Sequence, residues 1–251
     1  MNDRRGDLTG KTVFVAGGAG SIGGMVVRGC LRVGARVVTA SRSASRLERL
    51  RRFVEVDGLD QSCLVTLEGN LGDSAGAAQL GDLIGDRVGT PDAVIASLGG
   101  GMEPQPLLSM SLDTWHQTLD SNLTSHLLTA QTFRPAMIER GSGVYTAISG
   151  YGAYTAWPNG APVAIAAAGV IGLGRSLAAE NQNSGVRIAT MVLATGRDLW
   201  SEFAGKPGAF RGDDVGDFLA WLVSDAASGV EQPVLHFVTD WQKANAMRAI
   251  K

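Results

Sequence analysis

The chain has 251 residues, of which 45% are hydrophobic and 18% are charged, and its formal net charge is −2. This composition is typical of a globular protein, and the nearly balanced charge gives no reason to expect nucleic acid or a membrane surface as a partner. The first ten residues are polar, so no secretory signal is expected. The two cysteines, Cys30 and Cys63, form neither a disulfide framework nor a metal-ligand spacing, which favours a reducing cytoplasm and predicts no metal site.

Short apolar runs alternate along the chain with longer segments of helical spacing. Strands are predicted at residues 11–16, 35–40, 63–67, 93–96, 144–148, 186–193 and 234–238. Helices are predicted at residues 21–33, 45–52, 77–84, 111–119, 122–138, 164–180 and 213–224. Repeated β-then-α units predict an α/β protein, a doubly wound, Rossmann-like parallel sheet with helices on both faces. No linker or repeat interrupts the pattern, so we expect one domain over residues 1–251.

Residues 142–174 contain no Asp, Glu, Lys, Arg or His, and their number alone would permit a membrane span. Pro158, Gly160 and Pro162 interrupt any continuous helix there. The stretch is therefore predicted to be a buried strand, a loop and a buried helix, and no membrane partner is expected.

The first predicted strand runs directly into a glycine-rich segment that opens the first helix. Glycines at this point permit a tight turn and let the backbone approach a pyrophosphate, while the helix offers unpaired N–H groups. We expect Gly17, Gly20, Ser21, Ile22 and Gly23 to bind the phosphates of a dinucleotide. The alternative is a purely structural glycine turn.

The second predicted strand ends at Ser41, Arg42 and Ser43. An acidic residue at this tip would accept hydrogen bonds from an adenosine ribose and would repel a 2′-phosphate. The guanidinium of Arg42 instead suits the geometry of a phosphate. We therefore expect these three residues to bind the cofactor and NADP(H) to be preferred over NAD(H). The alternative is that Arg42 is only a solvated charge beside Arg46 and Arg49.

In these segments the chain resembles the short-chain dehydrogenase/reductase family. The first loop resembles the family's Thr-Gly-x-x-x-Gly-x-Gly, with Ser21 in place of the middle glycine. The segment after the fourth strand resembles its Asn-Asn-Ala-Gly, which implies cofactor contacts from Ser97, Leu98 and Gly99. Asn70 and Leu71 resemble the pair that touches adenine in the family. Further similarity at residues 172–180 and 214–225 extends the match over about residues 8–240.

The family's catalytic residues have no counterpart in this alignment. The family uses a Tyr as general acid/base, a Lys four residues later that lowers the Tyr pKa and holds the ribose, and a Ser after the fifth strand. The matching positions hold Val163, Ala167 and Gly150. No lysine occurs between Lys11 and Lys206, so a small shift of the alignment does not restore the pair.

Other residues near this place are candidates for the chemistry. Ser149 either contacts the substrate or nicotinamide or caps the strand end, and Tyr154 either shuttles protons or lines the pocket with Tyr151. Asn122 falls where the family keeps an Asn, and without the Lys it either assists catalysis or satisfies backbone at a helix bend. His126, one turn further, is a packing or interface residue or a catalytic one. Residues 197–212 are short for the family's substrate lid, which suggests an open site.

Three functions remain open from the sequence. The first is an NADP(H)-dependent oxidoreductase with a non-standard active site that acts on a small carbonyl or imine compound. The second is a non-catalytic NADP(H)-binding sensor or partner subunit. The third is a cofactor-independent lyase, isomerase or cyclase on the same fold. The resemblance also implies a homodimer or homotetramer built on the predicted helices at residues 122–138 and 164–180.

Overall fold

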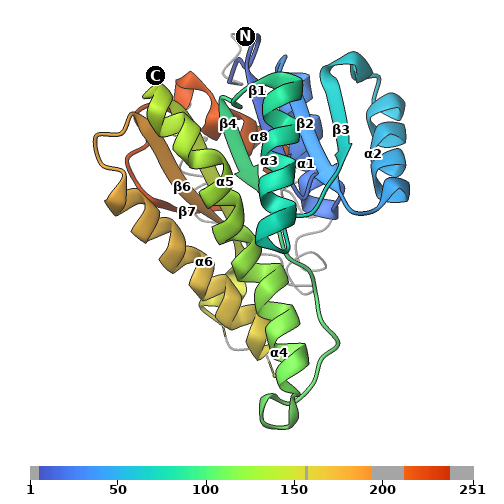
Figure 1. Cartoon of the computed structure of the whole chain (residues 1–251), viewed down its shortest axis with the longest axis vertical. Helices are drawn as coiled ribbons and strands as arrows, with labels where there is room; N and C mark the ends of the chain where they lie inside the picture. Colours follow the sequence, from blue (N-terminus) through green and yellow to red (C-terminus); the bar gives the residue numbers. More distant parts are fainter. Residues whose placement is uncertain (1–5, 156–157, 194–211, 238–251) are drawn as a thin grey trace, which may run out of the picture.

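The computed structural model of the chain describes residues 6–155, 158–193 and 212–237 (Figure 1). Within these ranges one seven-stranded sheet has the order β3-β2-β1-β4-β5-β6-β7, and every neighbouring pair is parallel. The strands are β1 (Thr12–Ala16), β2 (Arg36–Ser41), β3 (Leu64–Glu68), β4 (Ala93–Ala96), β5 (Gly143–Gly150), β6 (Val186–Leu193) and β7 (Val234–His236).

Helices cover both faces of the sheet. Figure 1 shows α3, α5 and α6 in front of the strands and α1 and α8 behind them. The helices are α1 (Ser21–Arg32), α2 (Ala44–Val56), α3 (Ser74–Val88), α4 (Leu112–Leu119), α5 (Ser125–Arg140), α6 (Ala161–Glu180) and α8 (Gly212–Val223). Short turns are the 3₁₀ helices η1 (Gln61–Cys63), η2 (Leu107–Ser109), η4 (Tyr151–Ala153) and η5 (Asp225–Ala227), and the π-helical turn η3 (Asp120–Thr124).

This architecture confirms the predicted doubly wound parallel sheet. Each predicted strand and helix has a counterpart whose ends shift by a few residues. One difference concerns the long helix predicted at residues 122–138. Its first turn is the π-helical turn η3, which joins α4 to α5 and carries Asn122. Single π turns inside helices are rare and occur often at functional sites.

The residues of the central strands β1 and β4 are buried on both faces, as a parallel sheet between two helical layers requires. Along β1, Val13 and Val15 belong to the core behind the sheet, whereas Phe14 and Ala16 belong to the core in front of it. Phe14 packs against Phe133 of α5, with ring centroids 4.6 Å apart. Complete burial of such a side chain stabilises the fold by about 1.5–3 kcal/mol.

The uncharged stretch forms β5, η4 and most of α6, as predicted. Among the described helices, α6 is long and apolar enough to cross a membrane by length and composition. In the fold it packs against β5 and β6, and its Val170 and Leu177 belong to the front core. Packing against the sheet accounts for the apolar residues on its buried side, which make up 33% of its most apolar window.

Behind the sheet, α1 and α8 touch backbone to backbone. A Cβ added at Gly29 would overlap the backbone of Gly216, and one at Gly216 would overlap the carbonyl oxygen of Met25. Arg32 of α1 donates hydrogen bonds to Asp213 at 2.7 Å and to Asp217 at 2.9 Å, both on α8. The two helices are therefore held together by close backbone packing and by ion pairs at the edge of that contact.

Replacing Gly216 with Ala is expected to lower the free energy of unfolding by about 1–3 kcal/mol, because the new methyl group forces the helices apart. Gly85→Ala, inside α3 and with no other atom within 4 Å of the added Cβ, is the matched control. Its expected effect is a gain of about 0.5–1 kcal/mol from helix propensity. Urea unfolding of both variants measures the two values, and equal stabilities would contradict the packing argument.

Candidate active site

The turn between β1 and α1 lies against the end of β4. Gly17 has a φ of +80°, and a Cβ there would overlap the carbonyl oxygen of Ser97. A Cβ at Gly23 would in turn overlap the carbonyl oxygen of Gly17. Both positions therefore need glycine, one for its backbone conformation and both for the close approach of backbone to backbone.

Helix α1 begins without a side-chain cap. Gly20 is its N-cap residue, and no side chain accepts a hydrogen bond from the first turn. The N–H groups of Ser21, Ile22 and Gly23 thus lie at the positive end of the helix dipole, and all three residues line the cleft described below. This arrangement fits a pyrophosphate.

The tip of β2 lies beside this turn, because Ala40 pairs with Ala16 at the ends of the two strands. The hydroxyl of Ser41 accepts a hydrogen bond from the backbone N–H of Ser43 at 3.1 Å. Ser43 is the N-cap of α2, and the Arg42 side chain between them is exposed. An exposed guanidinium next to a helix N-terminus is a favourable place for a phosphate.

The segment after β3 is fixed by its own hydrogen bonds. Asn70 accepts a hydrogen bond from the N–H of Gly72 at 2.9 Å and donates one to Asp73. Leu71 is buried in the front core. These contacts hold the loop that the resemblance places beside adenine.

A cleft of about 470 Å³ opens at the carboxyl ends of the central strands. In doubly wound sheets this edge is where ligands bind. Of the predicted site residues, Gly17, Ser41, Arg42, Ser43, Asn70, Leu71 and Tyr154 are not part of its lining. The lining consists of Gly20, Ser21, Ile22, Gly23, Ser97, Leu98, Gly99, Gly100, Gly101, Asn122, His126, Ile148, Ser149, Gly150, Gly152, Val163, Ala167, Val170 and Leu193.

Asn122 holds the glycine segment that follows β4. Its Oδ1 accepts a hydrogen bond from the N–H of Gly100 at 3.0 Å, and its Nδ2 donates to the carbonyl of Thr118 at 2.9 Å. Gly99 has a φ of +111°, and a Cβ there would overlap Oδ1 of Asn122. The side chain therefore links the π turn to one wall of the cleft, which is the backbone-supporting role considered for it above.

Ser149 lies at the end of β5 and is buried. Its hydroxyl donates a hydrogen bond of 2.8 Å to the carbonyl oxygen of Ala167 on α6. Ala167 and Val163, one helical turn earlier, both line the cleft on the α6 side. The hydroxyl of Ser149 thus joins the strand to the helix, and the adjoining wall of the cleft is apolar.

Tyr154 extends from the segment after η4 toward β7. Its hydroxyl lies 3.1 Å from Nε2 of His236, and the two rings are 5.3 Å apart. Its ring also lies 5.9 Å from that of Tyr151. Half of the Tyr154 side chain is exposed. The structure therefore brings Tyr154 to His236 and not into the lining of the cleft.

His126 is almost fully buried, with 1% of its surface exposed. Its Nε2 lies 3.3 Å from the carbonyl oxygen of Leu98, which can only accept, so Nε2 carries the proton. Nδ1 has no hydrogen-bond partner among the described residues. Burial lowers the pKa of His126 to about 4, and the bond to Leu98 opposes this only in part. The imidazole is therefore neutral at pH 7, and it packs inside the protein.

Sequence reasoning missed six residues of the cleft, namely Gly100, Gly101, Ile148, Gly152, Val170 and Leu193. Two signals were available for most of them. Gly100 and Gly101 directly continue the segment after β4, and Ile148 and Leu193 stand at strand ends on the ligand-binding edge. The predicted short lid at residues 197–212 lies outside the described residues except for its last position.

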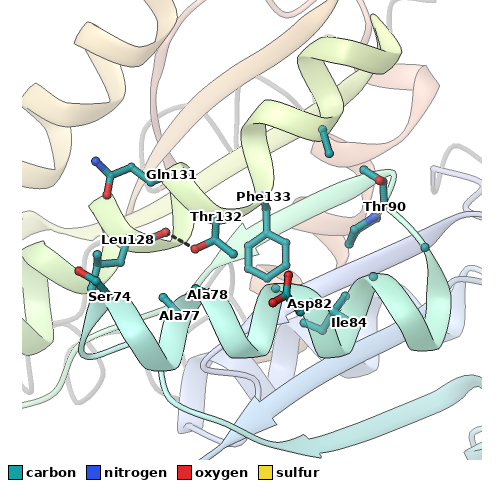
Figure 2. A pocket seen from close by; sticks show the side chains of 15 residues that line it. Ser74, Ala77, Ala78, Asp82, Ile84, Thr90, Leu128, Gln131, Thr132 and Phe133 are labelled. Carbon is teal, nitrogen blue, oxygen red and sulfur yellow. Dashed lines mark hydrogen bonds between the residues drawn. The ribbon is translucent and has the colours of Figure 1, made fainter.

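A second hollow, of about 440 Å³, lies between α3 and α5. Figure 2 shows Phe133 pointing from α5 toward α3, and Gln131 and Thr132 of α5 also line the hollow. Small residues of α3, among them Ala77, Ala78 and Gly81, form its other side. None of the predicted cofactor residues lies there, so the nucleotide motif belongs to the cleft. Among the described residues no group of three His, Cys, Asp or Glu side chains is placed to hold a metal ion.

Three comparisons relate this geometry to known proteins. Residues 16–195 match the family profile described as enoyl-(acyl carrier protein) reductase. The D-threitol dehydrogenase of Mycolicibacterium smegmatis is 27% identical over 234 residues, which cover 88% of each chain. The crystal structure of a metagenomic short-chain oxidoreductase in complex with NADP superposes with a TM-score of 0.78 at 24% identity, over 91% of this chain and 97% of that one. A short-chain type dehydrogenase/reductase from Mycobacterium ulcerans gives 0.81 at 22%, over 92% and 89%.

A parallel doubly wound sheet with a glycine turn and a cleft at its carboxyl edge defines a nucleotide-binding α/β protein. The profile match covers more than half of the chain and extends from the end of β1 past the end of β6. The chain therefore belongs to the short-chain dehydrogenase/reductase family, as the sequence motifs indicated, and this is a family of oxidoreductases that bind a nicotinamide cofactor.

Gly17→Ala is expected to weaken nicotinamide-cofactor binding at least about 10-fold, because the added methyl group separates the turn from β4 and strains a positive φ. Gly24→Ala is the matched control, since its Cβ would meet its nearest neighbour at 3.6 Å, an ordinary contact. Fluorescence titration with the reduced cofactor measures both affinities after circular dichroism has shown that the variants fold. Unchanged affinity in the folded Gly17 variant would contradict the assignment of the turn between β1 and α1 as the phosphate-binding site.

His126 is expected to make the protein less stable as the pH falls from 6.5 to 4. In this window the unfolded chain binds a proton at His126 that the folded chain does not, so the free energy of unfolding decreases by up to about 3 kcal/mol. The variant His126→Gln has no imidazole to take up this proton in the unfolded chain, so it should lose less stability over the same pH range. Urea unfolding of both proteins at several pH values measures the difference, and parallel curves would show that the imidazole is not buried as described.

Proposed function

We propose that the chain is an NADP(H)-dependent oxidoreductase with a non-standard active site that acts on a small carbonyl or imine compound. The observation that carries the proposal is the continuity of the cleft. One cavity runs from the uncapped start of α1, at Gly20–Gly23, to the ends of β5 and β6 at Ser149 and Leu193. A dinucleotide bound at the first place would bring its reactive ring toward the second.

The roles of the protein groups follow from their positions. The N–H groups of Ser21, Ile22 and Gly23 would bind the pyrophosphate, and Arg42 with the N-terminus of α2 would bind the 2′-phosphate. Asn122 keeps the glycine segment after β4 in place as a wall. The bound cofactor supplies or accepts the hydride. The protein contributes binding, orientation and an apolar surround.

A second function is favoured by one observation, the small apolar wall that Val163 and Ala167 present to the cleft. The resemblance assigns these positions to the proton donor and to the lysine of the family. A chain without them could bind NADP(H) and act as a sensor or as a partner subunit. Turnover of any carbonyl or imine compound with the bound cofactor would exclude this alternative.

We also propose a homodimer or homotetramer built on α5 and α6, in a reducing compartment such as the cytoplasm. Leu127 and Ile138 of α5 and Ile165 of α6 are large apolar residues that remain exposed in the single chain. Cys30 and Cys63 are both free thiols. An interface would remove the exposed apolar residues from water.

The cofactor preference is tested with Arg42→Ala. Loss of a charge-assisted hydrogen bond costs about 1.5–3 kcal/mol, so NADPH should bind about 10- to 100-fold more weakly while NADH is little affected. Arg49→Ala, which removes another exposed arginine of the same region, is the matched control and should change neither affinity by more than about 2-fold. Nicotinamide fluorescence measures all affinities. If NADH binds the wild-type protein at least as tightly as NADPH, the proposed preference is wrong.

A further inference from the structure

The end of the cleft formed by β5, β6 and α6 has apolar walls. Ile148 and Leu193 stand at the ends of the two strands, and Val163 and Val170 come from α6. Between them the surface is completed by small residues, Gly150 and Ala167. These six residues form the apolar end of the cleft.

Three polar side chains of the cleft lining have hydrogen-bond partners within the protein. The hydroxyl of Ser149 donates to the carbonyl of Ala167, and both ends of the Asn122 amide are hydrogen-bonded. His126 is neutral, and its one proton on nitrogen faces the carbonyl of Leu98. These hydrogen bonds connect the walls of the cleft, and the O–H and N–H protons of the three side chains face acceptors within the protein.

None of the three tyrosines of the chain is part of the lining of the cleft. Tyr145 is buried, and its hydroxyl donates to the carbonyl of His126 at 3.1 Å. Burial raises the pKa of this phenol well above its ordinary value. Tyr154 pairs with His236. Tyr151 lies between Gly150 and Gly152, which both line the cleft, and its side chain is 44% exposed.

This arrangement is unfavourable for reduction of a neutral carbonyl. Hydride addition to a ketone builds a negative charge on oxygen, and a positioned proton donor typically accelerates such a step about 10²- to 10⁴-fold. Among apolar walls an alkoxide without a hydrogen-bond donor is costly. A ketone would therefore react slowly at the apolar end.

An acceptor that carries its positive charge beforehand avoids this cost. In an iminium ion, the hydride forms a C–H bond at carbon while the C=N π electrons become the lone pair of an amine nitrogen. The dihydronicotinamide is oxidised to the nicotinamide cation, so one positive charge moves from substrate to cofactor and no proton is needed. No new charge appears in the cleft.

We infer that the substrate of this cleft is an iminium ion, a carbon–nitrogen double bond that is cationic before reduction, and not a neutral ketone or aldehyde. The inference rests on the proposed function and narrows its substrate class.

The test compares two bicyclic compounds of similar size, a permanently cationic N-methyl dihydroisoquinolinium and a neutral tetralone, with NADPH and the full chain. After subtraction of the reaction without protein, kcat/KM for the iminium is expected to exceed that for the ketone by about 100-fold or more. A ketone reduced within about 10-fold of the iminium would overturn the inference. That result would mean that a proton donor reaches the substrate.

The substrate preference is tested further with the double variant Val163→Tyr, Ala167→Lys. An acid/base pair at these two cleft positions is expected to raise ketone reduction at least about 10-fold and to lower the iminium-to-ketone ratio. The matched control is Val163→Phe, Ala167→Met, which adds similar bulk without a proton donor or a charge. If this control raises ketone reduction as much as the first variant, proton supply is not what limits the wild-type protein. Should either variant fail to fold, the wild-type ratio decides alone.

A binding measurement separates this inference from the proposed function. Nicotinamide fluorescence of the full chain measures NADPH binding independently of any turnover. If NADPH itself does not bind, the proposed function fails. If NADPH binds and the iminium is not reduced, the cofactor assignment stands and only the substrate inference is lost.

Discussion

The cleft depends on a contact between two backbone segments that side chains would prevent. The turn after β1 rests on the segment after β4 because Gly17 places no Cβ against the carbonyl oxygen of Ser97. Gly23, in the first turn of α1, rests on the same turn for the same reason. The helix therefore starts at the very edge of the sheet, and its free N–H groups face the space above β4. Any larger residue at these positions would move the helix and close or displace the binding edge.

The two ends of the cleft differ in what their polar groups do. At the α1 end the backbone donors are uncommitted, as an anion site requires. At the opposite end, the side chains of Ser149 and Asn122 form hydrogen bonds with backbone carbonyls and an N–H group of neighbouring segments. The α1 end thus has backbone N–H groups available to a ligand, while the polar side chains of the other end connect its walls. The α1 end therefore supports the cofactor assignment, and the opposite end supports the substrate inference.

The π turn at Asp120–Thr124 connects these two parts of the structure. It places Asn122 against the glycine segment after β4, and one turn later His126 reaches the carbonyl of Leu98. Both side chains contact the same short segment, residues 98–100, whose three residues also line the cleft. Nδ1 of His126 is buried without a hydrogen-bond partner among the described residues, and a buried group of this kind lowers stability.

The sequence by itself determined the elements and the family. β-branched runs, helical spacing and a glycine segment directly after the first strand are local patterns, and local patterns fix strands, helices and a phosphate turn. Only the tertiary structure decided which side chains meet. Tyr154 and His236 are 82 positions apart, and Ser149 bonds to a backbone carbonyl 18 residues later. Such partners depend on strand order and on how α5 and α6 pack over the sheet, and no local pattern encodes those long-range contacts. For the same reason Ile148, Val170 and Leu193 read as ordinary core residues in sequence and become walls of the cleft only in the fold.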